Sequence, residues 1–335
     1  MKRSVFAPVM LAAVLAVSSC GSSAPVISEK DLFAMDTIVS LKAYGKGGEK
    51  AVNAAADRIN ELERLFSVTR EDSDIALIDR LGTAKVAADT ENVITRALKV
   101  CESTDGALDI TIFPVMLAWG FTTGSEHVPD DKELADALGK VDFRSVVVNG
   151  GTVSVPEGYM LDLGSCAKGY TADEIADVMS ENGVISAIIS LGGNIRALGA
   201  KPDGSDWKVG ITDPFSPNEL LGTVSVRDKS VVTSGGYQRY FTDNTGKKRI
   251  HIIDPATGMP AESGLASVTV IGGDGLLCDA LSTALFVMGK DAALEYWREN
   301  GGFELILVTD DGVICTTGGA GFENTSSYGT ETVYE

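Results

Sequence analysis

The amino-acid sequence predicts an α+β protein in which mixed or antiparallel sheets are flanked by helices, with two closely packed lobes. Strand-like runs joined by short turns, as in residues 145–155 and 304–316, predict antiparallel hairpins. No strand-like run leads through G-x-G-x-x-G into a helix, so a doubly wound dinucleotide fold is not expected. The 335 residues suffice for one large domain or for two intimately packed lobes.

The first twenty residues predict export and lipid attachment. Two basic residues precede an apolar run over 5–17, which is too short for a mature spanning helix but typical of a secretory signal. Val17-Ser18-Ser19-Cys20 resembles a bacterial lipobox, and flexible Gly21-Ser22-Ser23 behind it favours this interpretation over an ordinary signal peptide with a chance cysteine. We therefore expect a lipidated Cys20 that anchors an exported protein to a membrane surface, at the periplasmic face of the inner membrane in a Gram-negative cell.

The mature chain is strongly acidic. The sequence has 28 Lys plus Arg and 47 Asp plus Glu, so loss of Lys2 and Arg3 leaves 28 − 2 = 26 basic residues and a net charge of 26 − 47 = −21. This balance disfavours nucleic acid as a partner, and an anionic ligand would need a cation or a group of backbone amides. With only His127 and His251 present, a multi-histidine zinc site is excluded.

Helices and strands alternate through the first half of the folded part. Residues 36–41 are expected to form a short strand, and apolar residues three and four apart over 52–66 predict an amphipathic helix. A second helix is expected over 92–103 and should end at Asp105-Gly106. The polar residues 122–138 are expected to form an insertion or a lid.

The second half continues with a helix over 171–182, stopped by Gly183, and a buried strand over 184–190. An almost wholly apolar helix is expected over 276–288. Further strands are expected over 207–212, 223–232 and 266–271, followed by the hairpin of 304–316. The whole chain is thus divided into a signal peptide (1–19), a tether (20–30), one folded domain (31–317) and a loose polar tail (318–335).

One turn predicts a binding site. Residues 162–169, Asp-Leu-Gly-Ser-Cys-Ala-Lys-Gly, place a carboxylate, two glycines and a lysine directly ahead of a helix. Glycines let a ligand approach the backbone closely, and the amides that open a helix favour an anion. The pattern alone is also typical of turns that only reverse the chain.

A second candidate lies on the apolar helix of 276–288. Asp279 and Thr283 are four residues apart and therefore share one face of this helix. A buried lone carboxylate needs a partner, and Mg²⁺ prefers carboxylate, hydroxyl and carbonyl oxygens. Hydrogen bonds from backbone amides to Asp279 are an equally weighted alternative.

Seven ordered motifs and the lipobox together resemble the ApbE family of FAD:protein FMN transferases, over residues 33–317. The motifs are Met35-Asp36-Thr37, residues 105–111, residues 162–170, Gly192-Gly193-Asn194, Ser234-Gly235-Gly236-Tyr237, residues 251–258 and residues 279–285.

This resemblance implies a Mg²⁺-dependent transfer in which FAD is cleaved at its pyrophosphate, FMN is joined to a threonine of a target protein through a phosphoester, and AMP leaves. It implies an exported or membrane redox protein as the acceptor. It implies catalytic roles for His251 and Asp279, and a metal held by the Ser165 carbonyl, Asp279 and Thr283, with Ser282 nearby. The implied flavin contacts are Met35, Ala107, Leu108, Asp109, Asp162, Lys168, His251 and Ile253.

Several points stay open in the sequence. His251 could deprotonate the acceptor threonine or orient the phosphate, or it could only make a structural hydrogen bond. Leu108 stands where the family often has Phe, and Val68-Thr69 occupies a stretch where an aromatic side chain is expected near the flavin. The alternative functions are an FAD pyrophosphatase that yields FMN and AMP, and an exported flavin-binding protein without catalysis.

Overall fold

A computed structural model describes residues 26–334 of the chain. The predicted signal peptide and the predicted lipidation site, Cys20, lie outside these residues. None of the helices within the described part is both long and apolar enough to cross a membrane.

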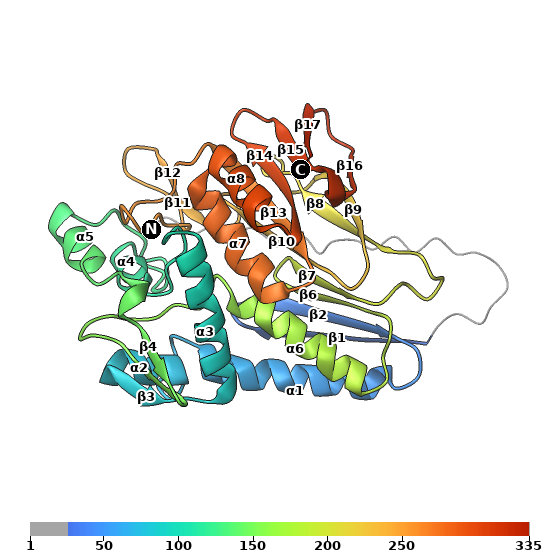
Figure 1. Cartoon of the computed structure of the whole chain (residues 1–335), viewed down its shortest axis with the longest axis horizontal. Coiled ribbons are helices and arrows are strands. Elements are labelled where there is room, and N and C mark those ends of the chain that lie inside the picture. Colours follow the sequence, from blue (N-terminus) through green and yellow to red (C-terminus); the bar gives the residue numbers. More distant parts are fainter. Residues whose placement is uncertain (1–25, 335) are drawn as a thin grey trace.

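The molecule is built on a nine-stranded sheet in the order β1-β2-β6-β7-β10-β13-β14-β15-β17 (Figure 1). Every neighbouring pair in it is antiparallel except β15 and β17, which are parallel. The strands are β1 (Ile27–Ala34), β2 (Thr37–Tyr44), β6 (Ala187–Leu191), β7 (Asn194–Leu198), β10 (Ser230–Gly235), β13 (Leu265–Gly272), β14 (Phe303–Thr309), β15 (Ile314–Thr317) and β17 (Thr330–Val333).

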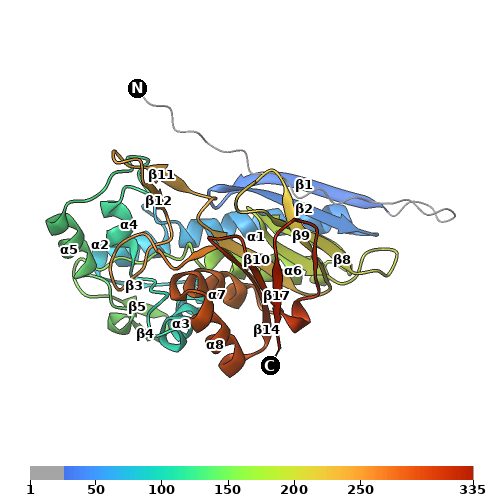
Figure 2. The same ribbon diagram turned by 90° about the horizontal axis from the view of Figure 1, so that it is seen from above.

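Helices cover one face of this sheet, as Figures 1 and 2 show. They are α1 (Gly48–Phe66), α3 (Ala88–Ser103), α6 (Ala167–Glu181), α7 (Gly275–Met288) and α8 (Lys290–Asn300). The amphipathic face of α1 and one face of α6 bury their apolar residues against β2 and β6. The apolar α7 packs with α3 and α8 against β10, β13 and β14, so two core clusters lie under one continuous layer of helices.

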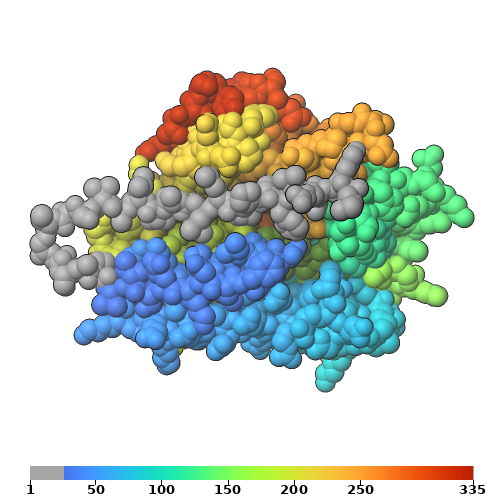
Figure 3. All heavy atoms as spheres, turned by 180° about the vertical axis from the view of Figure 1, so that it is seen from behind, coloured from blue at the N-terminus to red at the C-terminus, as the bar shows by residue number. Residues whose placement is uncertain are grey.

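A second, smaller sheet covers the opposite face of the large sheet. It consists of β8 (Trp207–Thr212), β9 (Leu220–Val226) and β16 (Phe322–Asn324). The fully buried Trp207 packs there with Ile271 and Ile306 from the large sheet. Figure 3, seen from behind, shows this yellow and red layer above the blue first hairpin, with the green helical lobe at one side.

The helical lobe forms the other end of the molecule (Figure 1). It contains α2 (Asp74–Leu81), α4 (Phe113–Ala118), α5 (Asp131–Leu138), the short helix Phe143–Ser145, the sheet β3-β5-β4 (Thr83–Lys85, Thr152–Ser154, Val147–Asn149) and the hairpin β11-β12 (Tyr240–Thr242, Lys248–Ile250). A separate apolar cluster around Trp119 and Phe121 holds α4 and α5 against the loop that contains Ile253. The α+β fold with two packed lobes, predicted from the sequence, is confirmed.

Three sequence predictions of local structure were wrong. Residues 223–232 are two strands, since the chain reverses at Asp228, which has a positive φ of 51°, and β9 and β10 belong to different sheets. The tail after residue 317 is not loose, because β16 pairs with β9 and β17 pairs with β15. The strand β1 begins at Ile27, so residues 27–30 are part of the fold and not of a tether.

Candidate active site

The site is organised by a close crossing of α6 and α7. A Cβ atom on Gly169 would lie 2.1 Å from the Gly275 carbonyl oxygen and 2.7 Å from the Asp279 Cβ, so only glycine allows this approach. The crossing brings Asp279 of α7 to the first turn of α6, where the Gly169 N–H donates to Asp279 Oδ2 at 2.8 Å. The two candidates found in the sequence, the 162–169 turn and the Asp279 helix, therefore form one site.

A carbonyl oxygen near this hydrogen bond has no partner in the described part of the chain. Gly169 is the third residue of α6, and the first N–H groups of a helix have no partner within it, so Asp279 caps this one. The Ser165 carbonyl lies just before the helix and accepts no hydrogen bond within residues 26–334. The carbonyl and the Asp279 carboxylate are therefore both found at the start of α6.

Asp279 is deeply buried, with 4% of its surface exposed. Burial raises the pKa of its carboxyl, while the nearby Lys168 charge and the Gly169 amide oppose this shift. A buried anion with one hydrogen bond and one nearby cation still lacks part of the stabilisation that water would give it. Of the two alternatives weighed from the sequence, the backbone-amide partner of Asp279 is observed, and the metal stays a prediction.

Three hydroxyl groups meet between β10 and α7. Ser234, at the end of β10, lies 2.7 Å from the Ser282 hydroxyl and 3.3 Å from the Thr283 hydroxyl. The fully buried Ser282 also donates to the Asp279 carbonyl at 2.8 Å, so its hydroxyl is held by protein groups. Thr283 is only half-buried and shares the Asp279 face of α7.

The oxygen atoms of Asp279, Ser165 and Thr283 fit a hard cation such as Mg²⁺. Such a cation accepts one carboxylate together with hydroxyl and carbonyl oxygens, and keeps positions for phosphate. The described residues contain no group of three or more His, Cys, Asp or Glu side chains that could hold a metal ion. A site with a single carboxylate is consistent with that finding, whereas a cage of several carboxylates or histidines is not.

The turn before α6 carries charged groups on the same side. Asp162 Oδ1 accepts the Gly164 N–H at 2.7 Å and so fixes the turn. Burial raises the pKa of Asp162, and Lys168 and Arg239 partly offset the shift. The half-buried Lys168 donates its ammonium to the Gly164 carbonyl at 3.0 Å and forms no ion pair within residues 26–334, so its charge is available to an anionic ligand.

His251 lies next to this turn and is held by the backbone of Arg239. Its Nδ1 lies 3.0 Å from the Arg239 carbonyl, which can only accept, so Nδ1 carries the proton and Nε2 is left as an acceptor. Burial lowers the pKa of His251 to about 4, and the charges of Arg239 and Lys168 act in the same direction. His251 is therefore neutral near pH 7.

The remaining predicted flavin contacts lie on neighbouring segments. Met35 sits in the β1-β2 turn with φ of 51°, and its sulfur is 3.5 Å from the Thr171 hydroxyl in α6. Both Asp109 oxygens are occupied, one by the Thr111 amide and hydroxyl and the other by the Phe143 amide. This loop reaches the site through the Asp162 N–H, which donates to the Ile110 carbonyl at 2.8 Å.

Three predicted flavin residues have different exposures. Leu108 and Ile253 are buried, in the main core and in the Trp119 cluster respectively, so their side chains are engaged in packing. Ala107 is half-buried at the edge of the main core. A ligand at Leu108 or Ile253 would meet mainly backbone atoms.

Sequence reasoning did not select Asn194, Ser234 and Arg239 as site residues. Asn194 and Ser234 belong to motifs that were noted, and their strands direct both side chains to the helix-covered face of the sheet. Arg239 belongs to none of the motifs, and its guanidinium donates to the Phe121 carbonyl. Its position near Asp162 depends on where the β11-β12 hairpin packs, which the local sequence does not indicate.

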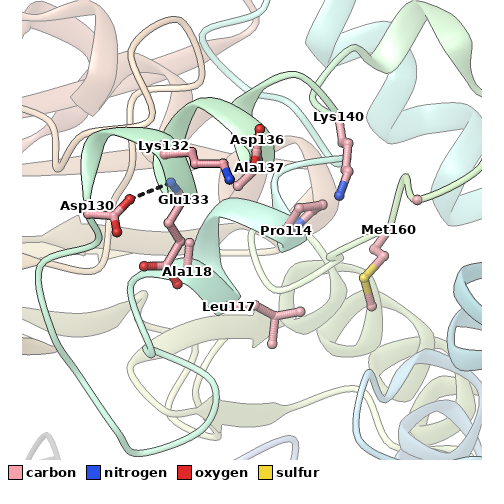
Figure 4. A pocket seen from close by; sticks show the side chains of 11 residues that line it. Pro114, Leu117, Ala118, Asp130, Lys132, Glu133, Asp136, Ala137, Lys140 and Met160 are labelled. Atoms are coloured by element: carbon pink, nitrogen blue, oxygen red, sulfur yellow. Dashed lines mark hydrogen bonds between the residues drawn. The ribbon is translucent and has the colours of Figure 1, made fainter.

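A surface groove of about 570 Å³ lies elsewhere, between α4 and α5 (Figure 4). Pro114, Leu117 and Met160 line it together with side chains of both charges, and Asp130 caps α5 there through the Glu133 N–H. The groove contains none of the predicted metal or flavin residues. We therefore place the chemistry at the α6-α7 crossing, where the buried carboxylate lies.

The fold and the crossing together define a class of protein: an α+β protein whose candidate site combines a buried carboxylate with neighbouring oxygen atoms and a lysine at the start of one helix. The chain belongs to the ApbE family, whose model matches residues 35–307. It is 34% identical to the FAD:protein FMN transferase of Treponema pallidum, over 90% of each chain. It is 29% identical to the FAD:protein FMN transferase of Haemophilus influenzae, over 96% of this chain and 97% of that one.

Solved structures agree with this assignment. The ApbE protein of Thermotoga maritima superposes with a TM-score of 0.81 at 31% identity, covering 86% of this chain and 96% of that one. The flavin transferase ApbE of Vibrio cholerae superposes with a TM-score of 0.77 at 25% identity, covering 90% and 97%.

Proposed function

We propose that the chain cleaves FAD at its pyrophosphate and transfers the FMN half to a threonine hydroxyl of an exported or membrane redox protein, with Mg²⁺ at the α6-α7 crossing. Membership of the ApbE family makes the chain an FAD:protein FMN transferase. The observation that supports the metal is the buried Asp279 carboxylate at the start of α6, next to which the Ser165 carbonyl accepts no hydrogen bond within residues 26–334.

The cation would be held by Asp279, Thr283 and the Ser165 carbonyl, with Ser282 supporting the helix turn between them. Mg²⁺ bound there would neutralise negative charge that develops on the pyrophosphate during transfer. The Lys168 ammonium, which among the described residues bonds only the Gly164 carbonyl, would bind the remaining phosphate oxygens. The protein thus mainly positions the reacting groups and stabilises charge.

The transfer itself needs an acceptor for one proton. The threonine oxygen forms a bond to the phosphorus of the FMN half, the bond from that phosphorus to the bridging oxygen breaks, and AMP leaves with the bonding electrons. We assign the threonine proton to Nε2 of His251, which is neutral and unprotonated because its Nδ1–H is held by the Arg239 carbonyl. The alternative is that His251 has a purely structural role. The assay of AMP release and protein-bound flavin, which also tests the metal site, tests this alternative.

The decisive experiment incubates the protein with FAD, Mg²⁺ and a candidate redox subunit, and follows AMP and protein-bound flavin. AMP with flavin on a threonine supports the transferase. AMP with free FMN would indicate a pyrophosphatase, and intact FAD would indicate a flavin-binding protein without catalysis. Each of the last two results would overturn the proposal.

The role of Asp279 as a metal ligand is tested with Asp279→Asn, which keeps the shape of the side chain and an oxygen that can accept the Gly169 N–H. We expect turnover to fall by at least about 100-fold, the cost typical of losing a transition-state charge contact. Asp213→Asn is the matched control, because Asp213 is equally buried at 4% exposed and also accepts backbone amides, but lies outside the site. Equal activity of the two variants would contradict the assigned metal ligand.

We further propose that the protein is exported and anchored through acyl chains on Cys20. The supporting observation is the lipobox-like Ser18-Ser19-Cys20 behind an apolar signal. A Cys20→Ser variant should move from the membrane fraction to the soluble exported fraction. Unchanged fractionation would argue against the anchor.

A further inference from the structure

A layer of buried polar side chains lies between β7 and the α6-α7 crossing. The Gly192-Gly193 turn has positive φ at both residues (60° and 100°), and makes Asn194 the first residue of β7, opposite Leu191. Because side chains alternate along a strand, Asn194 and Arg196 both point to the helix-covered face. They meet α6 and α7 there.

The Asn194 side chain lies beside Asp279. It is 5% exposed, and its Nδ2 makes no hydrogen bond to any group within residues 26–334. The amide is nevertheless close enough to stabilise the Asp279 anion against the larger, opposing effect of burial. A buried donor without a full partner is costly, and such groups are retained where they serve a site.

Arg196 connects the same strand to the start of α7. Its Nε lies 3.4 Å from Asp173 Oδ1, and its Nη1 donates to the carbonyls of Asp228 and Gly273. Asp173, in α6, accepts the Gly275 N–H at 2.7 Å, so one carboxylate ties α6, α7 and β7 together. The contacts of Asp173 with Arg196 and Gly275 fix the start of α7 against α6. They therefore determine which turn of α6 faces Asp279.

We propose that Asn194 is a positioning residue that orients the Asp279 carboxylate for the metal, and that the Arg196–Asp173 pair holds α7 in the register this requires. The Gly169 N–H holds Asp279 Oδ2, and the buried Asn194 amide on β7, which has no other partner within residues 26–334, acts on the same carboxylate. The inference rests on the proposed function, because it assumes a cation at this crossing.

The test uses Mn²⁺ as a paramagnetic probe of the full-length protein, followed by electron paramagnetic resonance, with metal-free FAD binding measured by flavin fluorescence. Asn194→Leu, similar in size but without a donor, should weaken Mn²⁺ binding by about 10–100-fold, as loss of an outer-shell partner does. FAD binding without metal should be unchanged. Arg196→Met should weaken Mn²⁺ binding as well, and Arg196→Lys should restore part of it.

Ser263→Ala is the matched control, because the Ser263 hydroxyl is also buried without a partner but lies by Gly289, at the other end of α7. Asn194→Ala replaces Asn194→Leu if the larger side chain prevents folding. Wild-type Mn²⁺ affinity in the Asn194 variants would overturn this inference alone. Weaker FAD binding with unchanged Mn²⁺ affinity would also overturn it, by making Asn194 a phosphate ligand. A wild-type protein that binds no Mn²⁺ would instead overturn the proposed metal site.

Discussion

Replacing Gly169 by alanine tests the central claim that the α6-α7 crossing makes the site. The new Cβ would lie 2.1 Å from the Gly275 carbonyl oxygen, whereas ordinary contact begins near 3.4 Å, so the helices must separate by 3.4 − 2.1 = 1.3 Å there. The atoms it meets are backbone atoms and the Asp279 Cβ, which cannot move aside as a flexible side chain could. The separation would pull Asp279 away from the Gly169 N–H and the Ser165 carbonyl.

Two opposing effects decide the stability of this variant. Alanine is favoured over glycine within a helix by about 0.5–1 kcal/mol. Overpacking of a close contact costs about 1–3 kcal/mol or more. The clash with backbone atoms is severe, so we expect a net loss of about 1–2 kcal/mol, or roughly 2–8 °C in Tm.

Activity should fall much further than stability, because a displacement of about 1 Å at a reacting centre can cost about 100-fold in rate. The assay is AMP release from FAD in the presence of Mg²⁺ and an acceptor protein, on samples whose Tm and circular dichroism show that they are folded. Gly329→Ala is the control, since a Cβ at Gly329 meets no atom within 4 Å. A Gly169→Ala protein with wild-type stability and turnover would refute the reasoning.

Three further predictions concern pH and the chain end. Burial lowers the pKa of His251 from 6.5 to about 4, so the unfolded chain binds more protons than the folded protein between these two pH values. The free energy of unfolding should therefore fall as the pH drops from 6.5 to about 4. In urea melts, His251→Gln should lack this part of the pH dependence. Burial raises the pKa of Asp79 from 3.8 to about 7, so its carboxyl weakens the fold as pH rises through that window. Asp79→Asn, which can still accept the Leu161 N–H, should therefore be more stable than wild type above pH 7 and equal to it near 3.8; equal stability throughout would refute the shift. Truncation after Thr317 removes β16 and β17 and should lower the Tm by thermal circular dichroism, whereas an unchanged Tm would show that these strands add nothing.

Local patterns in the sequence predicted the elements that carry the chemistry. The helix expected over 276–288 is α7 (Gly275–Met288), and the expected run 207–212 is β8. The turn at 162–169 could be found because glycines and a helix start are local features. The helix after it begins at Ala167, four residues earlier than expected, so Lys168 and Gly169 are helical and their amides can face Asp279.

The rest of the site depends on pairings between distant residues. Asn194 reaches Asp279 only because β7 lies beside β10 in the large sheet and under the helix crossing. The tail is polar and rich in small residues, which locally indicates a loose segment, yet parallel pairing with β15 orders it. Neither fact has a signal in the neighbouring sequence, since sheet order is set by packing of the whole domain.

The charges at the site explain how a strongly acidic protein can hold an anionic dinucleotide. Asp162 and Asp279 accept backbone amides from Gly164 and Gly169, and the charge of Lys168 also stabilises both carboxylates. Across residues 26–334, however, neither Lys168 nor Arg239 forms an ion pair; their side chains donate to backbone carbonyls instead. The neutral His251 adds no charge of its own. These two cations therefore make the mouth of the site favourable for phosphate, although the chain as a whole is acidic.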